Sequence, residues 1–298
     1  MFLVMAATYV IRRAIVSIAL AAIFAGCTLL MPKEIEEMLK ETSAGAAALK
    51  AERPDAFHTY EAGERTIHYV EVSDDTPKPL ILFIHGSPGR WQDFVRYMND
   101  PDLRAKAHMI SVDRPGFGGS GYGVVERSMV KQCDDITPLL DKVGAGQRVI
   151  VVGYSYGGPM AFRLAMDHPD KVTDIFIIAG SVDPEEEHTK WFQYVAEWPL
   201  VNRAVPTDLT VANREIRALK ADLVDMLPRW KDITQPVTFI QGDADELVPP
   251  ANADFAETQL THSASVNIVR IPGANHFTPW NHYDLVKAEL LKQIQFKR

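Results

Sequence analysis

The stretch VIVVGYSYGG occupies residues 149–158 and decides the fold. Its first four residues are all apolar, as is typical of a strand covered on both faces of a sheet. A helical pattern over residues 156–167 follows at once. Between strand and helix stands the pattern G-x-S-x-G, centred on Ser155. This pattern is typical of a sharp turn that exposes a serine oxygen, and its glycines are needed because larger side chains would collide with neighbouring backbone.

Strand and helix patterns alternate on both sides of this stretch. Strands are expected at 66–72, 80–84, 108–112, 149–152, 175–178, 237–240 and 266–271, and helices at 126–143, 156–167, 251–260 and 282–296. The alternation predicts an α/β fold, a mostly parallel sheet of the eight-stranded type with helices on both faces.

The predicted core comprises residues 60–180 and 232–298. Residues 181–231 contain no apolar strand but are rich in aromatic residues and proline. Because ligands bind at the carboxyl ends of parallel strands, we interpret this insertion as a helical lid. The alternative is a set of packing helices with no role in substrate binding.

Composition excludes several classes of protein. The 298 residues are 47% apolar and carry a net charge of −8, which argues against disorder and against nucleic acid as a partner. Only one long apolar stretch exists, so the chain is not a polytopic membrane protein. The sequence contains no metal-ligand cluster and no phosphate-binding glycine loop, and we expect no cofactor.

The N-terminus has the character of a targeting segment. Arg12 and Arg13 precede an uncharged apolar run at 14–26, which ends at Cys27. The run is about 20 Å of helix, too short to cross a hydrocarbon core of roughly 30 Å. It resembles a bacterial lipoprotein signal. That resemblance implies removal of residues 1–26, lipidation of Cys27, a tether at 27–59 and a location in the bacterial cell envelope. The alternative is an uncleaved membrane anchor.

The second cysteine, Cys133, lies within the helical pattern at 126–143. If Cys27 is lipidated, no intrachain disulfide can form. We expect Cys133 to be a small buried apolar side chain.

An exposed serine needs a base and an orienting carboxylate to act as a nucleophile. His276 follows the last predicted strand and is the best candidate base. Asp243, Asp245 and Glu246 follow the strand at 237–240 and are all candidate carboxylates. Carboxyl ends of parallel strands meet at one edge, so these side chains are expected to lie close to Ser155.

Five motifs in order resemble the serine α/β-hydrolase family over residues 60–296. They are HGSPG at 85–89, DRPGFGGS at 113–120, GYSYG at 153–157, GDADELVP at 242–249 and GANHF at 273–277. The resemblance implies that Asp245 is the acid, and it implies oxyanion donors from the backbone N–H groups of Ser87 and Tyr156. The chain order Ser155, Asp245, His276 is that of the fold.

The motifs also narrow the activity. Haloalkane dehalogenases and epoxide hydrolases of this family carry aspartate where this chain has Ser155, and proline iminopeptidases carry a second glycine where it has Ser87. We therefore predict hydrolysis of a carboxylic ester of a small molecule, with Trp91, Tyr154 and Trp191 as candidate substrate contacts. The alternatives are an aminopeptidase or amidase of the proline-iminopeptidase type and a non-catalytic ligand-binding protein.

Overall fold

The computed structural model describes residues 33–295, apart from residues 75, 145 and 190. The predicted signal and Cys27 lie outside the described residues and stay predictions. Within the described part, no helix is both long enough and apolar enough to span a membrane. The chain divides into two units at residues 43 and 44. The sheet, the site and every described helix after residue 52 belong to the second unit, whereas the helix at Lys33–Glu52 begins in the first.

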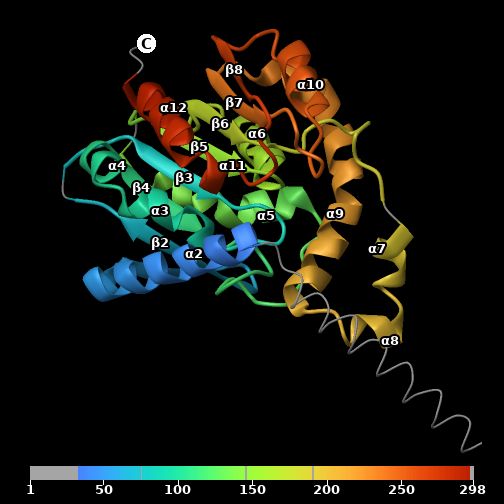
Figure 1. Ribbon diagram of the computed structural model, residues 1–298. Helices are drawn as coiled ribbons and strands as arrows, with labels where there is room; N and C mark the ends of the chain where they lie inside the picture. The colour runs from blue at the N-terminus through green and yellow to red at the C-terminus, as the bar shows by residue number, and fades with distance from the viewer. Residues whose placement is uncertain (1–32, 75, 145, 190, 296–298) are drawn as a thin grey trace, which may run out of the picture. The chain divides into compact units, whose positions relative to one another are not determined.

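One eight-stranded sheet organises this unit (Figure 1). Its strands are β1 (Phe57–Ala62), β2 (Arg65–Val72), β3 (Leu80–Ile84), β4 (His108–Val112), β5 (Val149–Tyr154), β6 (Asp174–Ile178), β7 (Val237–Gly242) and β8 (Val266–Ile271). Their order is β1-β2-β4-β3-β5-β6-β7-β8. Strand β2 runs antiparallel to both of its neighbours, and every other pair is parallel. The predicted α/β class, with a mostly parallel sheet, is confirmed.

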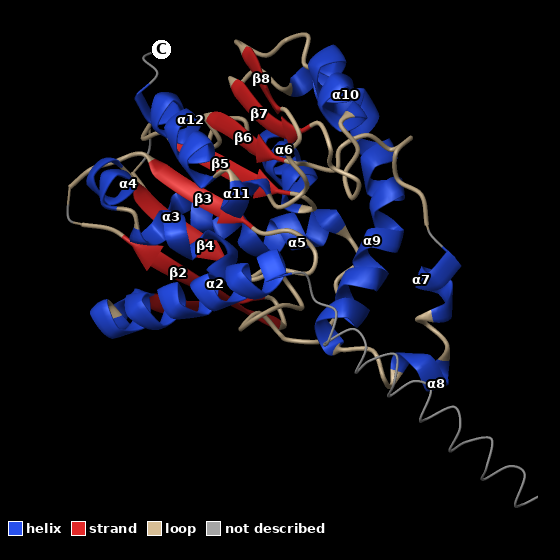
Figure 2. Ribbon diagram, in the orientation of Figure 1, coloured by secondary structure: helices blue, strands red, loops and turns tan. Residues whose placement is uncertain are grey.

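Helices cover both faces of the sheet (Figure 2). They are α2 (Lys33–Glu52), α3 (Val95–Asn99), α4 (Pro101–Lys106), α5 (Met129–Ile136), α6 (Gly157–Asp167), α7 (Trp191–Val195), α8 (Pro199–Asn202), α9 (Thr207–Met226), α10 (Ala251–Gln259), α11 (Thr278–Asn281) and α12 (Tyr283–Gln295). Short 3-10 helices lie at Pro54–Ala56, Trp91–Phe94, Thr137–Lys142 and Leu227–Asp232.

Side chains alternate along each central strand between two apolar layers. In β3, Leu80, Leu82 and Ile84 pack in the layer that contains α5 and α6, whereas Ile81 and Phe83 pack in the layer that contains α3 and α12. All five are at most 1% exposed. A strand buried on both faces is mostly apolar, which explains why β3 is an uninterrupted apolar run. Strands β4 and β7 are also buried at every position but include polar residues such as Ser111 and Thr238.

The structure differs from the predicted tether at 27–59. Leu49 and Ala56 are buried in the core, and β1, which starts at Phe57, pairs with β2 along its whole length. The chain therefore joins the core well before residue 60.

The helix predicted at 126–143 is interrupted. Its first part is α5 and its second part is a 3-10 helix that contains Pro138, because proline lacks the N–H that a continuing α-helix needs.

Cys133 is buried in α5, as predicted. Burial raises the pKa of its thiol well above the ordinary value, so the group stays protonated and inert.

The insertion between β6 and β7 is helical, as expected, and contains α7, α8 and α9 (Figure 1). Helix α9 buries one face in the core, with Val211, Leu219 and Leu223 at most 2% exposed. Helix α7 instead carries two exposed aromatic side chains, Trp191 at 76% and Tyr194 at 53%, and Trp198, which directly precedes α8, is 62% exposed. Helix α9 is thus part of the packed body, while a lid movement of the insertion stays a prediction.

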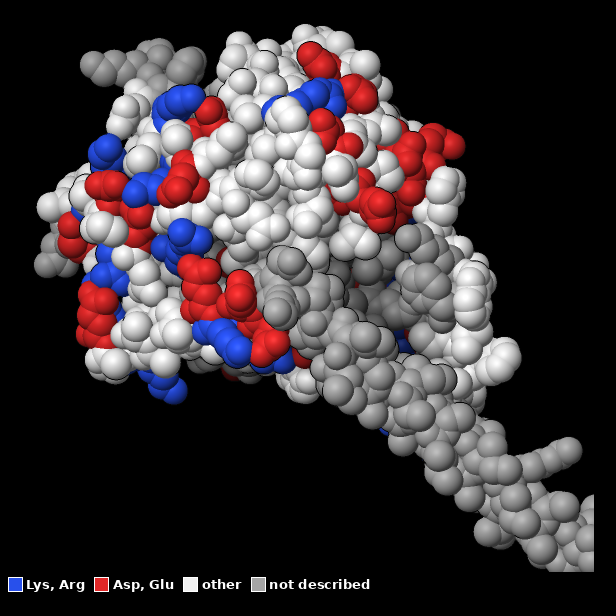
Figure 3. All heavy atoms as spheres, viewed as in Figure 1, with Lys and Arg blue, Asp and Glu red and all other residues white. Residues whose placement is uncertain are grey.

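Charged side chains are unevenly spread on the face drawn in Figure 3. Acidic residues gather near α10 and the adjoining end of α9, and acidic and basic residues are interspersed near α4. The described part of this face presents no continuous basic stripe.

Candidate active site

The site lies where parallel strands end. Ser155 directly follows β5, Asp245 follows β7, and His276 lies between β8 and α11. The loop that begins at His85 follows β3, which lies beside β5 in the sheet. These strands are parallel, so their carboxyl ends share one edge, and the topology brings the four loops to that edge.

Ser155 stands in a strained turn between β5 and α6. Its φ is 53°, in the left-handed region that side chains other than glycine rarely adopt. The two flanking glycines are required by close backbone contact. A Cβ on Gly153 would lie 2.2 Å from the Gly157 carbonyl oxygen, and a Cβ on Gly157 would lie 2.2 Å from the Ile84 carbonyl oxygen. This is the collision that the sequence pattern predicts, and such strain is often found at functional sites.

Asp245 is the carboxylate that contacts His276. The His276 Nδ1 and Asp245 Oδ2 atoms are 2.8 Å apart. The other oxygen, Oδ1, accepts hydrogen bonds from the backbone N–H groups of Leu247 and Val248, each at 2.9 Å. The Gln241 side-chain amide donates to Oδ2 at 3.3 Å. Asp245 is 4% exposed, so its carboxylate is fixed in position by four partners.

The other two candidate carboxylates lie elsewhere. Asp243 is exposed and accepts a hydrogen bond from the Gly273 backbone N–H at 2.5 Å. Glu246 is also exposed. Neither carboxylate has a hydrogen bond to His276 within the described residues.

Tyr154 lies behind His276 and holds its loop next to the serine turn. Its hydroxyl donates to the His276 backbone carbonyl at 3.2 Å, and the two ring centroids are 5.1 Å apart. Trp280 packs edge-on against Tyr154 at 5.4 Å. Burial raises the pKa of the Tyr154 phenol, which therefore stays protonated as a donor. Tyr154 is 5% exposed and contacts the histidine, and its predicted role as a substrate contact stays a prediction.

The hydrogen bonds of the described residues include none between Ser155 and His276. The two are linked through Tyr154, which precedes the serine in the chain and contacts the histidine. Catalytic hydrogen bonds are often long without substrate and tighten when it binds.

The two predicted oxyanion donors are unpaired in the part of the chain that the structure describes. The backbone N–H of Ser87 and that of Tyr156 donate to no protein acceptor there. Both flank the serine. Tyr156 follows it directly, and a Cβ on Gly86 would lie 3.0 Å from the Ser155 Cβ. Tyr156 is 2% exposed, whereas Ser87 is half-buried. Both N–H groups are therefore available to an acceptor beside the strained serine, and their role as oxyanion donors stays a prediction.

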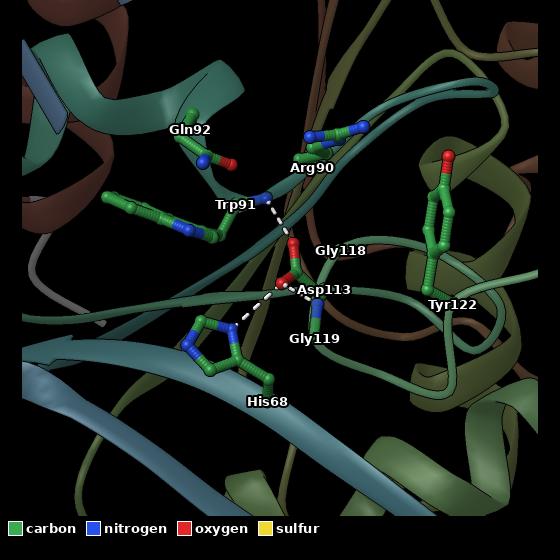
Figure 4. Close-up of a pocket in the computed structure, with 8 residues that line it drawn as sticks. All are labelled: His68, Arg90, Trp91, Gln92, Asp113, Gly118, Gly119 and Tyr122. Atoms are coloured by element: carbon green, nitrogen blue, oxygen red, sulfur yellow. Dashed lines mark hydrogen bonds and ion pairs between the residues drawn. The ribbon is translucent and has the colours of Figure 1, made fainter. Parts of the chain in front are cut away.

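Trp91 and Trp191 are the other two substrate contacts that the sequence predicts. Trp91 lines a cavity of about 450 Å³ together with His68, Asp113 and Tyr122 (Figure 4). In that cavity the Asp113 carboxylate accepts hydrogen bonds from the backbone N–H groups of Trp91 and Gly119 and contacts His68 Nδ1, each at 2.8 Å. The Trp91 ring is 5% exposed and packs edge-on against Phe57.

Trp191 lies on the outer part of the insertion, and its exposure leaves its role as a substrate contact a prediction. Within the described ranges, no group of three or more His, Cys, Asp or Glu side chains could hold a metal ion. Three residues near the site were not predicted from the sequence. Trp280 packs against Tyr154, and Arg114 forms a buried ion pair with Glu215. The last two lie 101 positions apart, so no local spacing indicates their contact.

Comparison with known proteins gives the same fold. A family model described as alpha/beta hydrolase fold matches residues 79–202. Epoxide hydrolase 3 of Xenopus tropicalis is 32% identical over 113 residues, which cover 37% of this chain and 30% of that protein. Epoxide hydrolase B of Mycobacterium tuberculosis is 32% identical over 112 residues, covering 37% and 31%. The match therefore spans about a third of the length of these relatives.

Solved structures extend the similarity over most of the chain. A hydrolase from Pseudomonas aeruginosa PA01 aligns with a TM-score of 0.61 at 15% identity, covering 79% of this chain and 97% of that one. The enol-lactonase from Burkholderia xenovorans LB400 aligns with a TM-score of 0.62 at 14% identity, covering 80% and 100%. From the strand order, the strained serine turn and these matches, we conclude that the chain has the α/β-hydrolase fold.

Proposed function

We propose that the protein is a serine hydrolase that cleaves a carboxylic ester of a small substrate through an acyl-enzyme. Ser155 is the nucleophile, His276 the general base and Asp245 the carboxylate that orients it. As the Ser155 oxygen attacks the ester carbonyl, His276 Nε2 takes the hydroxyl proton and then gives it to the departing alcohol. A water activated by His276 releases the acid and restores the serine.

The observation that carries this proposal is the contact between His276 Nδ1 and the buried Asp245 carboxylate at 2.8 Å. With Nδ1 donating to Asp245, Nε2 is the nitrogen free to accept a proton. The carboxylate also stabilises the imidazolium that forms during the reaction. Asp245 itself keeps its orientation because two backbone N–H groups hold its other oxygen.

The unpaired N–H groups of Ser87 and Tyr156 support the same mechanism. Negative charge develops on the carbonyl oxygen in the transition state, and each fixed donor at an oxyanion contributes about 3 kcal/mol. The donors belong to backbone that is packed in place, so little reorganisation is needed when the charge forms.

The identity of the nucleophile favours an ester over an epoxide, although the relatives named above are epoxide hydrolases. The residue at the centre of the sharp turn after β5 is Ser155 in this chain, whereas the epoxide hydrolases of this fold use an aspartate there. A serine that attacks a carbonyl forms an acyl ester, which water can hydrolyse.

The test is turnover of p-nitrophenyl acetate by wild-type protein and by Ser155→Ala, which we expect to be slower by about 10⁶-fold. Ser263→Ala is the matched control. In the described part of the chain, the Ser263 hydroxyl contacts the backbone carbonyls of Gln235 and Ser265, and neither residue belongs to the proposed site. Circular dichroism checks that each variant is folded. A folded Ser155→Ala protein with wild-type turnover would contradict the proposal. A parallel screen of p-nitroanilides and aminoacyl anilides distinguishes an esterase from an amidase.

A further inference from the structure

A buried arginine lies beneath the proposed oxyanion loop. Arg114 and Glu215 are both 0% exposed, and they form a bidentate ion pair with N–O distances of 2.7 and 2.9 Å. The Arg114 Nη1 atom also donates to the Gln132 side-chain oxygen at 2.7 Å. Arg114 belongs to the loop after β4 and Glu215 to helix α9 of the insertion. The carboxylate that forms the ion pair with the arginine thus belongs to the insertion.

The remaining donors of Arg114 hold two consecutive carbonyls of the loop. Its Nε donates to the His85 carbonyl at 3.0 Å, and its Nη2 donates to the Gly86 carbonyl at 2.8 Å. The ring of His85 adds a second contact, since its Nδ1 lies 2.8 Å from the Gly86 carbonyl oxygen. Because the Arg114 backbone N–H donates to His85 Nε2 at 2.9 Å, the proton of the neutral ring stands on Nδ1 and is donated to Gly86.

The His85 ring is neutral, because burial and the neighbouring arginine lower its pKa well below the ordinary value. The Gly86 carbonyl therefore accepts two hydrogen bonds at once, one of them from a charged group.

The Gly86 carbonyl and the Ser87 N–H belong to the same peptide unit. A trans peptide is planar, so its C=O and N–H point in opposite directions, and fixing one fixes the other. Hydrogen bonds to the carbonyl also polarise the unit and make its N–H a stronger donor. Arg114 thus determines both the direction and the strength of the donor at Ser87.

The same guanidinium lies under the second donor residue. The Arg114 Cζ atom is 4.4 Å from the centroid of the Tyr156 ring, and the Gln132 amide, which bonds Glu215 at 3.1 Å, also reaches the Tyr156 hydroxyl at 3.3 Å. One buried network therefore contacts Tyr156 and the Gly86 carbonyl of the peptide that carries the Ser87 N–H.

We infer that Arg114, held by Glu215 of α9, is a positioning residue that sets the Gly86–Ser87 peptide for oxyanion stabilisation. The inference rests on the proposed function. It makes the insertion part of the catalytic framework, because α9 supplies the counter-charge without which the arginine would not be held in this position.

The test compares Arg114→Lys with Arg148→Lys. Lysine keeps the charge but cannot bond Glu215 and the two carbonyls together. Arg148 is a matched control, since it also pairs with a buried carboxylate, Asp174, and donates to two backbone carbonyls, those of Gln293 and Ile294. Both variants should lose thermal stability. Only Arg114→Lys should lower kcat for p-nitrophenyl acetate, by roughly 10- to 100-fold, with KM within about twofold.

The affinity for a straight-chain trifluoromethyl ketone is a second measurement, and it would not change if Arg114 only stabilised the fold. The ketone forms a hemiketal oxyanion with the serine, so its affinity should fall for Arg114→Lys by the same factor as kcat/KM. Should that variant fail to fold, Glu215→Gln, which keeps the side-chain shape, should give the same pattern. A folded variant with wild-type kcat and ketone affinity would overturn the inference alone, whereas absence of turnover by the wild type would overturn the proposed function.

Discussion

Asp245→Asn separates the orientation of His276 from the rest of the site. The Asn side-chain oxygen can still accept from the Leu247 and Val248 N–H groups, so the loop should keep its shape. At the other position an NH₂ group replaces Oδ2, and it can only donate to His276 Nδ1. The ring is then driven to carry its proton on Nε2, where it cannot take the proton of Ser155.

The expected loss in kcat is about 10⁴-fold, the size measured for the same change in a serine-protease triad, which corresponds to about 5.5 kcal/mol of transition-state stabilisation. The effect on folding should be smaller. The variant loses one charge-assisted hydrogen bond, and it places an NH₂ group near the Gln241 amide donor, which is 3.3 Å from Oδ2. A loss of about 2 kcal/mol in the free energy of unfolding follows.

The assay is kcat/KM for p-nitrophenyl acetate, with the free energy of unfolding measured by urea denaturation. Asp243→Asn is the control, since that carboxylate is exposed and bonds only the Gly273 N–H. We expect the control to keep wild-type turnover. Full activity in folded Asp245→Asn, or a comparable loss in Asp243→Asn, would refute the assignment of the acid.

Three further changes test the strain, charge and packing around the site. Ser155→Gly should be about 1 kcal/mol more stable than Ser155→Ala, because φ is 53° there, and equal stabilities in denaturant would contradict the strain. Asp93→Asn should stabilise the protein increasingly from pH 4 to 7. Burial raises the pKa of Asp93 to about 7, so the wild-type protein loses stability as the pH rises from about 4 through that pKa. A difference in melting temperature between the variant and the wild type that does not change with pH would contradict this. Gly158→Ala should cost about 2 kcal/mol in calorimetry, because its Cβ would lie 2.7 Å from the Gly180 Cα.

The central strands could be predicted because each is covered on both faces and reads as an apolar run, as β3 does. Strand β1 could not be predicted in this way. It is an edge strand that pairs only with β2, and its residues FHTYEA are at most half-buried, so no local pattern marks it. Tertiary pairing, which the local sequence does not contain, makes it a strand.

The residues of the site also fall into those that a local sequence pattern predicts and those that it does not. The placement of Ser155, Asp245 and His276 at strand ends could be predicted, because backbone geometry there demands recognisable glycine and proline patterns around them, while their catalytic roles stay predictions. Arg114 and Glu215 were missed, since charged residues are ordinarily exposed and this pair meets only through the packing of α9. The contact between Tyr154 and His276 could not be predicted for a related reason. The sequence shows an aromatic residue beside the serine, but not that its ring turns into the layer beneath His276.

The most direct test of the account is covalent labelling with a fluorophosphonate, followed by mass spectrometry of the intact protein and of its peptides. We expect a single adduct on the peptide that contains Ser155, absent in Ser155→Ala and formed far more slowly in His276→Ala. A folded wild-type protein that gains no adduct, or that gains it on another residue, would contradict the claim that Ser155 is an activated nucleophile.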